Sequence, residues 1–318
     1  MLGFKVSIMI VLSNFIISSC SSIKRHPSAI NKQDTSSSLD IFLHEARDSS
    51  TNTEKLMSIT EKMASEQSTN SYPYKSSQIF MAILKNQNVN ADIMQSLLRQ
   101  ISITNTAIPR TSNILIEFYK NRIKYPSGVQ DLLLIDILRT IGQSAVKIEN
   151  AVDVLLYISN SLSNNEGISG YGLTAITRSK HEIDNVSQFY KAIIAKKVYP
   201  MRLEEHISSI FSTTREIQEI EGILSKANEV NNSLLKASNY SDDVDDHGYT
   251  IIVGILKYEW KIHNTFSLIK EILRSKRSQN EKRLLFYAVE EFVKKDKIQL
   301  SSSEHREILD IAKKNLIH

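Results

Sequence analysis

One side chain near the N-terminus has the chemistry of an acyl acceptor. Cys20 is the only cysteine among the 318 residues, and a thiolate is a good nucleophile. It follows a positively charged start with Lys5 and a stretch from Val6 to Ile17 that is apolar except for two serines and an asparagine. These residues are too few to span a bilayer core of about 30 Å, which needs about 20 helical residues. The pattern is typical of a secretory leader that is cleaved close to Cys20.

The residues Ile17-Ser18-Ser19-Cys20 resemble the lipobox of bacterial lipoproteins. In that family a dedicated peptidase cuts before a cysteine that carries a diacylglyceryl group. The resemblance covers only residues 1–20, and it implies a signal peptide over residues 1–19, a lipid-modified Cys20 and membrane lipid as a partner. It also implies a lipid-anchored location in the cell envelope, on the outer membrane facing the periplasm in a Gram-negative cell. The alternative is an ordinary secretory signal that is cut nearby.

The composition of the remaining chain is that of an ordinary globular protein. Hydrophobic residues make up 41% and charged residues 23% of the sequence. Lys5 leaves with the leader, so 38 of the 39 basic side chains remain against 35 acidic ones, which does not indicate nucleic-acid binding. With Cys20 acylated no disulfide can form, and core packing must supply the stability. No later run of 18 apolar residues predicts another membrane span.

Three Ser-x-x-Lys spacings could place a serine nucleophile beside a lysine base on a helix, as in the penicillin-binding proteins. They are Ser21/Lys24, Ser144/Lys147 and Ser267/Lys270. The companion Ser-Asp-Asn and Lys-Thr-Gly motifs of those enzymes are absent from the sequence. We therefore expect no catalytic residue in these pairs.

Three of the eight glycines of the mature chain fall within residues 166–176. The run Gly172–Ile176 resembles the Gly-Leu-Met-Gln-Ile segment of lytic transglycosylases, which cleave peptidoglycan with one buried, protonated glutamate. Thr174 and Ala175 replace the Met and Gln, and Glu149 and Glu166 lie at the wrong distances for that acid. We expect a flexible loop between helices here, with the peptidoglycan-cleaving enzyme as the alternative.

The acidic run Asp242–Gly248 could suggest calcium, but counting from Asp243 puts Gly254 where a calcium loop needs its closing glutamate. We expect these carboxylates to cap a helix that begins near Tyr249. The eight histidines contain no His-Glu-x-x-His pattern. No metal and no cofactor are therefore expected.

Two further features are expected to be structural. The basic segment from Lys270 to Lys297 is interrupted by acidic residues, which favours a solvated helical surface over a contact with anionic lipid or glycan. Trp260 and Tyr258 are predicted to belong to the core.

Amphipathic helices are predicted from Leu39 to the C-terminus, about a dozen to fifteen in number. Four prolines lie where the hydrophobic period resets, as expected at helix ends, namely Pro73, Pro109, Pro126 and Pro200. Residues 132–141 are apolar nearly all round, which predicts a central helix covered on more than one side. Leu134 and Leu155 are expected in the core.

The predicted fold class is all-α, either an irregular multi-helix bundle or a degenerate α-solenoid of antiparallel helices. A search for a repeat of 34 to 45 residues finds no signature of the tetratricopeptide kind. Residues 20–38 are predicted to form the lipidated cysteine and a flexible tether, and residues 39–318 the helical domain.

These features favour a non-enzymatic, membrane-anchored envelope lipoprotein with a helical protein-interaction domain. Such a protein serves as a scaffold or accessory subunit of a secretion-type or conjugation-type machine, with partner proteins that the sequence does not name. A lytic transglycosylase-like enzyme is the alternative. A small-ligand carrier is a third possibility, and it would need one large apolar pocket.

Overall fold

The computed structural model describes residues 32–317, apart from residues 66–70, 163–167, 169, 197–199, 212–218, 238–246, 258–264, 276 and 295–300. The described residues form fifteen α-helices and no strand, which confirms the all-α class and the predicted number of helices. In this part of the chain, no helix combines the length and the apolar character needed to cross a bilayer.

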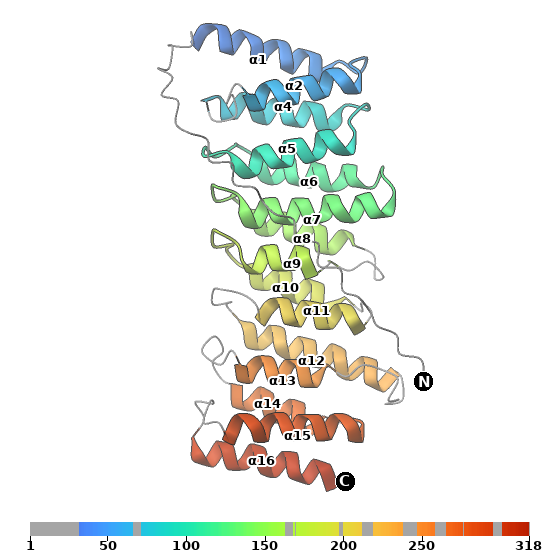
Figure 1. Cartoon of the computed structure of the whole chain (residues 1–318), viewed down its shortest axis with the longest axis vertical. Helices are drawn as coiled ribbons and strands as arrows, with labels where there is room; N and C mark the ends of the chain where they lie inside the picture. The colour runs from blue at the N-terminus through green and yellow to red at the C-terminus, as the bar shows by residue number, and fades with distance from the viewer. Residues whose placement is uncertain are drawn as a thin grey trace, which may run out of the picture.

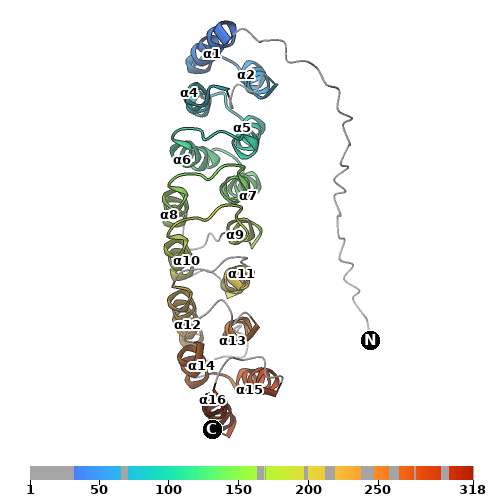
Figure 2. The same cartoon turned by 90° about the vertical axis from the view of Figure 1, so that its left-hand side faces the viewer.

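The helices stack along one long axis, from α1 at one end to α16 at the other (Figure 1). Figure 2 shows that they alternate between two rows. The first row holds α1 (Lys32–Arg47), α4 (Pro73–Lys85), α6 (Thr111–Arg122), α8 (Ala151–Ser161), α10 (Val186–Ala195), α12 (Ile220–Ala237) and α14 (Thr265–Arg274). The second row holds α2 (Thr53–Ser65), α5 (Ala91–Ile103), α7 (Ser127–Gln143), α9 (Gly170–Thr177), α11 (Pro200–Phe211), α13 (Gly248–Lys257) and α15 (Gln279–Lys294). The last helix, α16 (Ser302–Ile317), packs against both α14 and α15.

Each helix contacts the next helix of its own row, so the molecule is an α-solenoid rather than a bundle. The core lies between the two rows and runs the length of the stack. Leu134 and Leu155 are 4% and 0% exposed, which confirms their predicted burial. The four prolines also lie at helix starts: Pro73 and Pro200 open α4 and α11, Pro126 directly precedes α7, and Pro109 lies two residues before α6.

A backbone feature repeats where the chain enters the first row. The residues before α6, α8, α10 and α12 all have a left-handed conformation, with φ between 54° and 60°, and they are Arg110, Asn150, Asn185 and Glu219. In the first three of these turns a buried isoleucine lies two residues earlier, at Ile108, Ile148 and Ile183. The residues after α7 and α9 also bond to the end of the preceding second-row helix, because Ala145 N donates to Ser102 O of α5 at 2.9 Å and Lys180 N to Gly142 O of α7 at 2.7 Å.

The pattern of buried positions repeats along the chain, whereas the residue types at these positions change. Between residues 101–120 and 141–160, eight buried positions coincide at an interval of 40 residues. The pairs are Ile101/Ile141, Thr104/Ser144, Ile108/Ile148, Thr111/Ala151, Ile114/Val154, Leu115/Leu155, Phe118/Ile158 and Tyr119/Ser159. The fold is therefore the degenerate α-solenoid of the two predicted alternatives.

Residues 170–176 form part of a helix in which Gly172 serves packing, and this corrects the predicted flexible loop for these residues. These residues belong to α9, while residues 163–167 and 169 lie outside the description. A Cβ on Gly172 would overlap the side chain of Leu138, and one on Gly142 would overlap the backbone carbonyl of Ala175. Both glycines let α7 and α9 approach closely, because only hydrogen fits between the two helices.

Of three further expectations, one needs correction, one is confirmed and one lies outside the described residues. The predicted boundary between tether and domain at Ser38–Leu39 falls inside α1, which begins at Lys32. The helix predicted to be covered on more than one side is α7, which packs against α5, α6 and α9, although its Leu132 is 55% exposed on the open face of the second row. The helix expected to continue through Tyr258 and Trp260 is described only as α13, and both aromatic residues lie outside the description.

Candidate functional site

The predicted lipidation site lies outside the described residues. Cys20, the whole leader and the pair Ser21/Lys24 all precede Lys32, where the description begins. Lipidation of Cys20 therefore stays a prediction.

The other two Ser-x-x-Lys pairs have structural partners. Ser144 is buried and its hydroxyl accepts a hydrogen bond from Val146 N at 3.4 Å, while the Lys147 amine pairs with Asp184 at 3.0 Å. In the third pair Ser267 is exposed and Lys270 pairs with Glu307 at 3.1 Å. In neither pair does the lysine contact the serine, so the geometry does not activate a nucleophile.

The acidic run before α13 is described only at its end. Asp242–Asp246 lie outside the description, and α13 begins at Gly248, close to the predicted start at Tyr249. His247 is buried, and its backbone N donates to Asn231 Oδ1 at 3.1 Å. No group of three or more potential metal ligands occurs among the described residues.

One glutamate does lie beside α9, but it caps the helix. Glu205 of α11 accepts a hydrogen bond from Gly170 N at 3.1 Å, at the start of α9. Glu205 is only partly buried and serves as a helix cap, unlike the buried acid that a lytic transglycosylase needs. Glu149 is exposed in the turn before α8, and Glu166 lies outside the description.

The basic segment after Lys270 differs from the predicted solvated surface at one residue. Arg277 is 4% exposed and donates to Asn228 Oδ1 at 3.1 Å and to Ile272 O at 3.2 Å. Nearby, the buried Glu281 accepts a hydrogen bond from Tyr249 N at 2.9 Å, at the start of α13. Arg277 therefore holds α12 to the α14–α15 turn.

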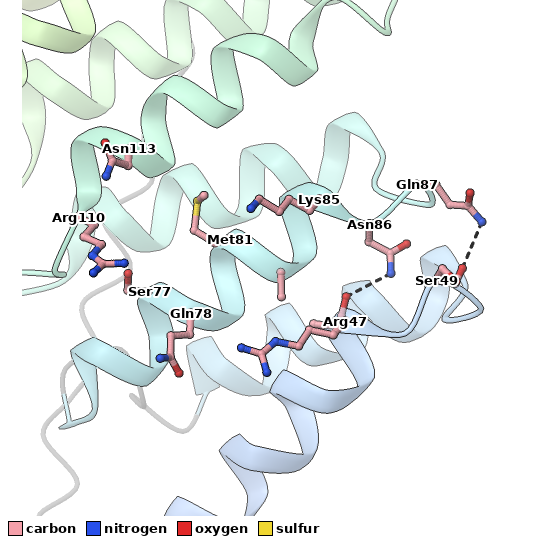
Figure 3. Close-up of a pocket in the computed structure, with 12 residues that line it drawn as sticks. Arg47, Ser49, Ser77, Gln78, Met81, Lys85, Asn86, Gln87, Arg110 and Asn113 are labelled. Atoms are coloured by element: carbon pink, nitrogen blue, oxygen red, sulfur yellow. Dashed lines mark hydrogen bonds between the residues drawn. The ribbon is translucent and has the colours of Figure 1, made fainter.

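A groove on the first row brings together three cations that no sequence pattern connected. The α4 groove, about 640 Å³ in volume, runs over the exposed face of α4 between the end of α1 and the start of α6. Arg47 comes from α1, Lys85 from α4 and Arg110 from the turn before α6 (Figure 3). Among the residues that the structure describes, none that lines the groove is acidic.

Hydrogen bonds between neighbouring helices fix the walls of the α4 groove. Asn86 Nδ2 donates to Ala46 O at 3.2 Å and to Asp48 O at 2.9 Å, which holds the end of α1 to the end of α4. Ser77 Oγ donates to Pro109 O at 2.7 Å, which holds the start of α4 to the turn that carries Arg110. Both ends of the groove are thus set by the fold rather than by a ligand.

The carboxylates close to the groove are engaged elsewhere. Glu45 pairs with Lys55 at 3.1 Å and Asp40 with Lys75 at 2.7 Å. Hydrogen bonds from the backbone N–H and the hydroxyl of Ser50 lower the pKa of Asp48. Arg47, Lys85 and Arg110 make no ion pair with any residue that the structure describes, so their charges are left to the groove.

A second groove of about 570 Å³ continues along the first row between the turns before α6 and α8. It shares Arg110 and Asn113 with the α4 groove, but Glu149 and Asp153 balance its cations. Of the two, only the α4 groove presents a single sign of charge. Both are open and lined partly by charged and amide side chains, unlike the enclosed apolar pocket of a ligand carrier.

The chain matches no family of known proteins, and no curated protein or solved structure is similar to it.

Proposed function

We propose that the protein is a non-enzymatic scaffold of the cell envelope, anchored through acylated Cys20 and binding a partner protein along its helical solenoid. The observation that carries the proposal is the two-row stack (Figure 2) with the open α4 groove on its first row (Figure 3). In a solenoid each repeat packs only against its neighbours, so both rows keep one helix face accessible over their whole length. Such extended surfaces suit the binding of another macromolecule.

The lipid anchor adds a kinetic and thermodynamic advantage to this proposal. Two acyl chains hold a protein at a membrane far more firmly than one chain does. Anchoring also converts the meeting with a membrane-embedded partner into a local event with a raised effective concentration. A scaffold gains from this arrangement, whereas an enzyme with a diffusing substrate gains little.

The proposal is tested with Cys20→Ser, which keeps the leader and the solenoid but removes the acyl acceptor. Labelled palmitate should enter the wild type and not the variant, and the variant should lose most of its ability to restore a deletion strain. Circular dichroism of the purified variant should be unchanged. Equal labelling of both proteins would refute the anchor.

Glu149→Gln separates the scaffold from the enzyme. Because Glu149 is an exposed turn residue, its neutralisation should leave cellular activity intact. The same result is expected for Glu166→Gln. Release of soluble fragments from peptidoglycan by purified wild type, abolished by either glutamine variant, would establish the glycosidase instead.

A further inference from the structure

We propose that the α4 groove binds an extended acidic segment of the partner protein, with carboxylates on alternate residues. This rests on the proposed scaffold function and names the chemistry of the partner. The groove supplies three cations, no lining carboxylate and a fixed shape. Charge complementarity therefore selects an anionic occupant.

The spread of the three cations selects an extended occupant over a single anion. Ser77 lies beside the turn that carries Arg110, and Lys85 lies eight residues further along α4, which is about 12 Å of helix. Figure 3 shows the side chains of Arg47 and Arg110 entering from opposite sides, with Lys85 directed along α4 toward Met81. One phosphate would need its donors to converge within about 3 Å. Alternate side chains of an extended peptide lie about 7 Å apart, so two or three carboxylates fit this spread.

The rest of the lining fits a peptide better than a lipid headgroup. Met81 and Ala82 of α4 give the groove an apolar floor, and Gln78 and Asn113 bring amide groups to its sides. Amides can both donate to and accept from a peptide backbone, and an apolar floor accommodates a side chain between two acidic ones. A lipid headgroup would need only the three cations, and it would not use the amide groups or the apolar floor.

The backbone at Arg110 gives an independent reason to assign a binding role. It has φ 60° and ψ 27°, a left-handed conformation that is unfavourable for most side chains. At the equivalent positions Asn150 and Asn185 are residue types that tolerate this conformation, and Glu219 forms an ion pair with Lys191. The Arg110 side chain has no such partner among the described residues. The left-handed turn recurs at all four positions and so belongs to the fold, but at Arg110 neither the residue type nor an ion pair offsets its cost. A strained residue of this kind is typical of ligand sites.

The test is fluorescence anisotropy with the protein purified from membranes in detergent. The probe is a labelled ten-residue peptide with aspartate at alternate positions, and its control has asparagine at those positions. The aspartate peptide should bind, with an affinity that falls steeply as salt rises, and the asparagine peptide should bind at least about tenfold more weakly.

Two sets of substitutions locate the binding. Combining Arg47→Gln, Lys85→Gln and Arg110→Asn should reduce the affinity at least about thirtyfold, as expected when several charge-assisted contacts are lost. The matched control combines Arg99→Gln, Lys124→Gln and Arg178→Gln, three exposed cations outside the groove with the same loss of charge. The control should stay within about twofold of the wild type.

Four results would overturn the inference. Equal losses in both triple variants would mean that only net charge matters. Equal binding of the two peptides would remove the role of carboxylates. The groove would be assigned to lipid if the protein bound phosphatidylglycerol vesicles but not the peptide, and if the vesicle binding depended on Arg47, Lys85 and Arg110. If peptide binding fails while Cys20→Ser still abolishes complementation, the groove inference fails and the scaffold proposal stands.

Discussion

Two arginines show how differently the two ends of the solenoid use the same side chain. Arg277, near the C-terminal end, is buried and donates to Asn228 Oδ1 and Ile272 O. Arg110, near the N-terminal end, is exposed in a groove and makes no ion pair or side-chain hydrogen bond with a described residue. Burial of a cation is costly unless it is paired, so Arg277 serves the fold. The Arg110 side chain is exposed and makes no such contacts, which is why we propose a role in binding for it.

The first measurement gives the loss of unfolding free energy expected for a core residue, with which the arginine variants can be compared. Leu155 is 0% exposed in α8, between the two rows, and Leu155→Ala should lower the free energy of unfolding by about 2–5 kcal/mol. Leu132→Ala is the matched control, because Leu132 is 55% exposed and should cost less than about 1 kcal/mol. Urea unfolding followed by circular dichroism measures both. Equal costs would mean that the core does not lie between the two rows.

The second measurement concerns the buried arginine. Arg277→Gln should lower the free energy of unfolding by about 2–4 kcal/mol, because Asn228 Oδ1 loses a buried donor. Affinity for the aspartate peptide should not change, since Arg277 lies outside the α4 groove. A loss below about 0.5 kcal/mol would place Arg277 on the solvated surface that the sequence predicts.

The third and smallest effect has the opposite sign. Arg110→Asn should raise the free energy of unfolding by about 0.5–1 kcal/mol, because asparagine tolerates the left-handed conformation better than arginine does. The same substitution should weaken peptide binding. A variant that is both less stable and weaker in binding would make Arg110 a structural residue, like Arg277.

The helices of this fold could be predicted from the sequence, but their arrangement could only be narrowed to two alternatives, an irregular bundle or a degenerate α-solenoid. Apolar spacing and four prolines indicate the helices and several of their starts, because both depend on local backbone preferences. The repeat was harder to find, since burial at positions such as Phe118 and Ile158 persists while the residue type changes. The turns offered one signal, namely an isoleucine two residues before Arg110, Asn150 and Asn185.

The α4 groove could not be predicted from spacing. Arg47 lies in α1, Lys85 in α4 and Arg110 in the turn before α6, and only the stacking of these helices brings them to one surface. The exposure of Leu132 has a related reason, because an apolar residue on the open face of the second row has the same sequence pattern as a buried one. Both features depend on tertiary arrangement, which a local pattern does not contain.

The central claim is that the anchored solenoid binds a protein through its α4 groove. Its most direct test is site-specific photo-cross-linking in living cells, with a cross-linking amino acid in place of Gln78 inside the groove or of Arg99 on the second row. We expect one dominant protein adduct from position 78 and none from position 99. The adduct from position 78 should disappear when Lys85→Gln and Arg110→Asn are added, and it should weaken strongly with Cys20→Ser. Adducts from position 78 that are indifferent to both changes would contradict the account.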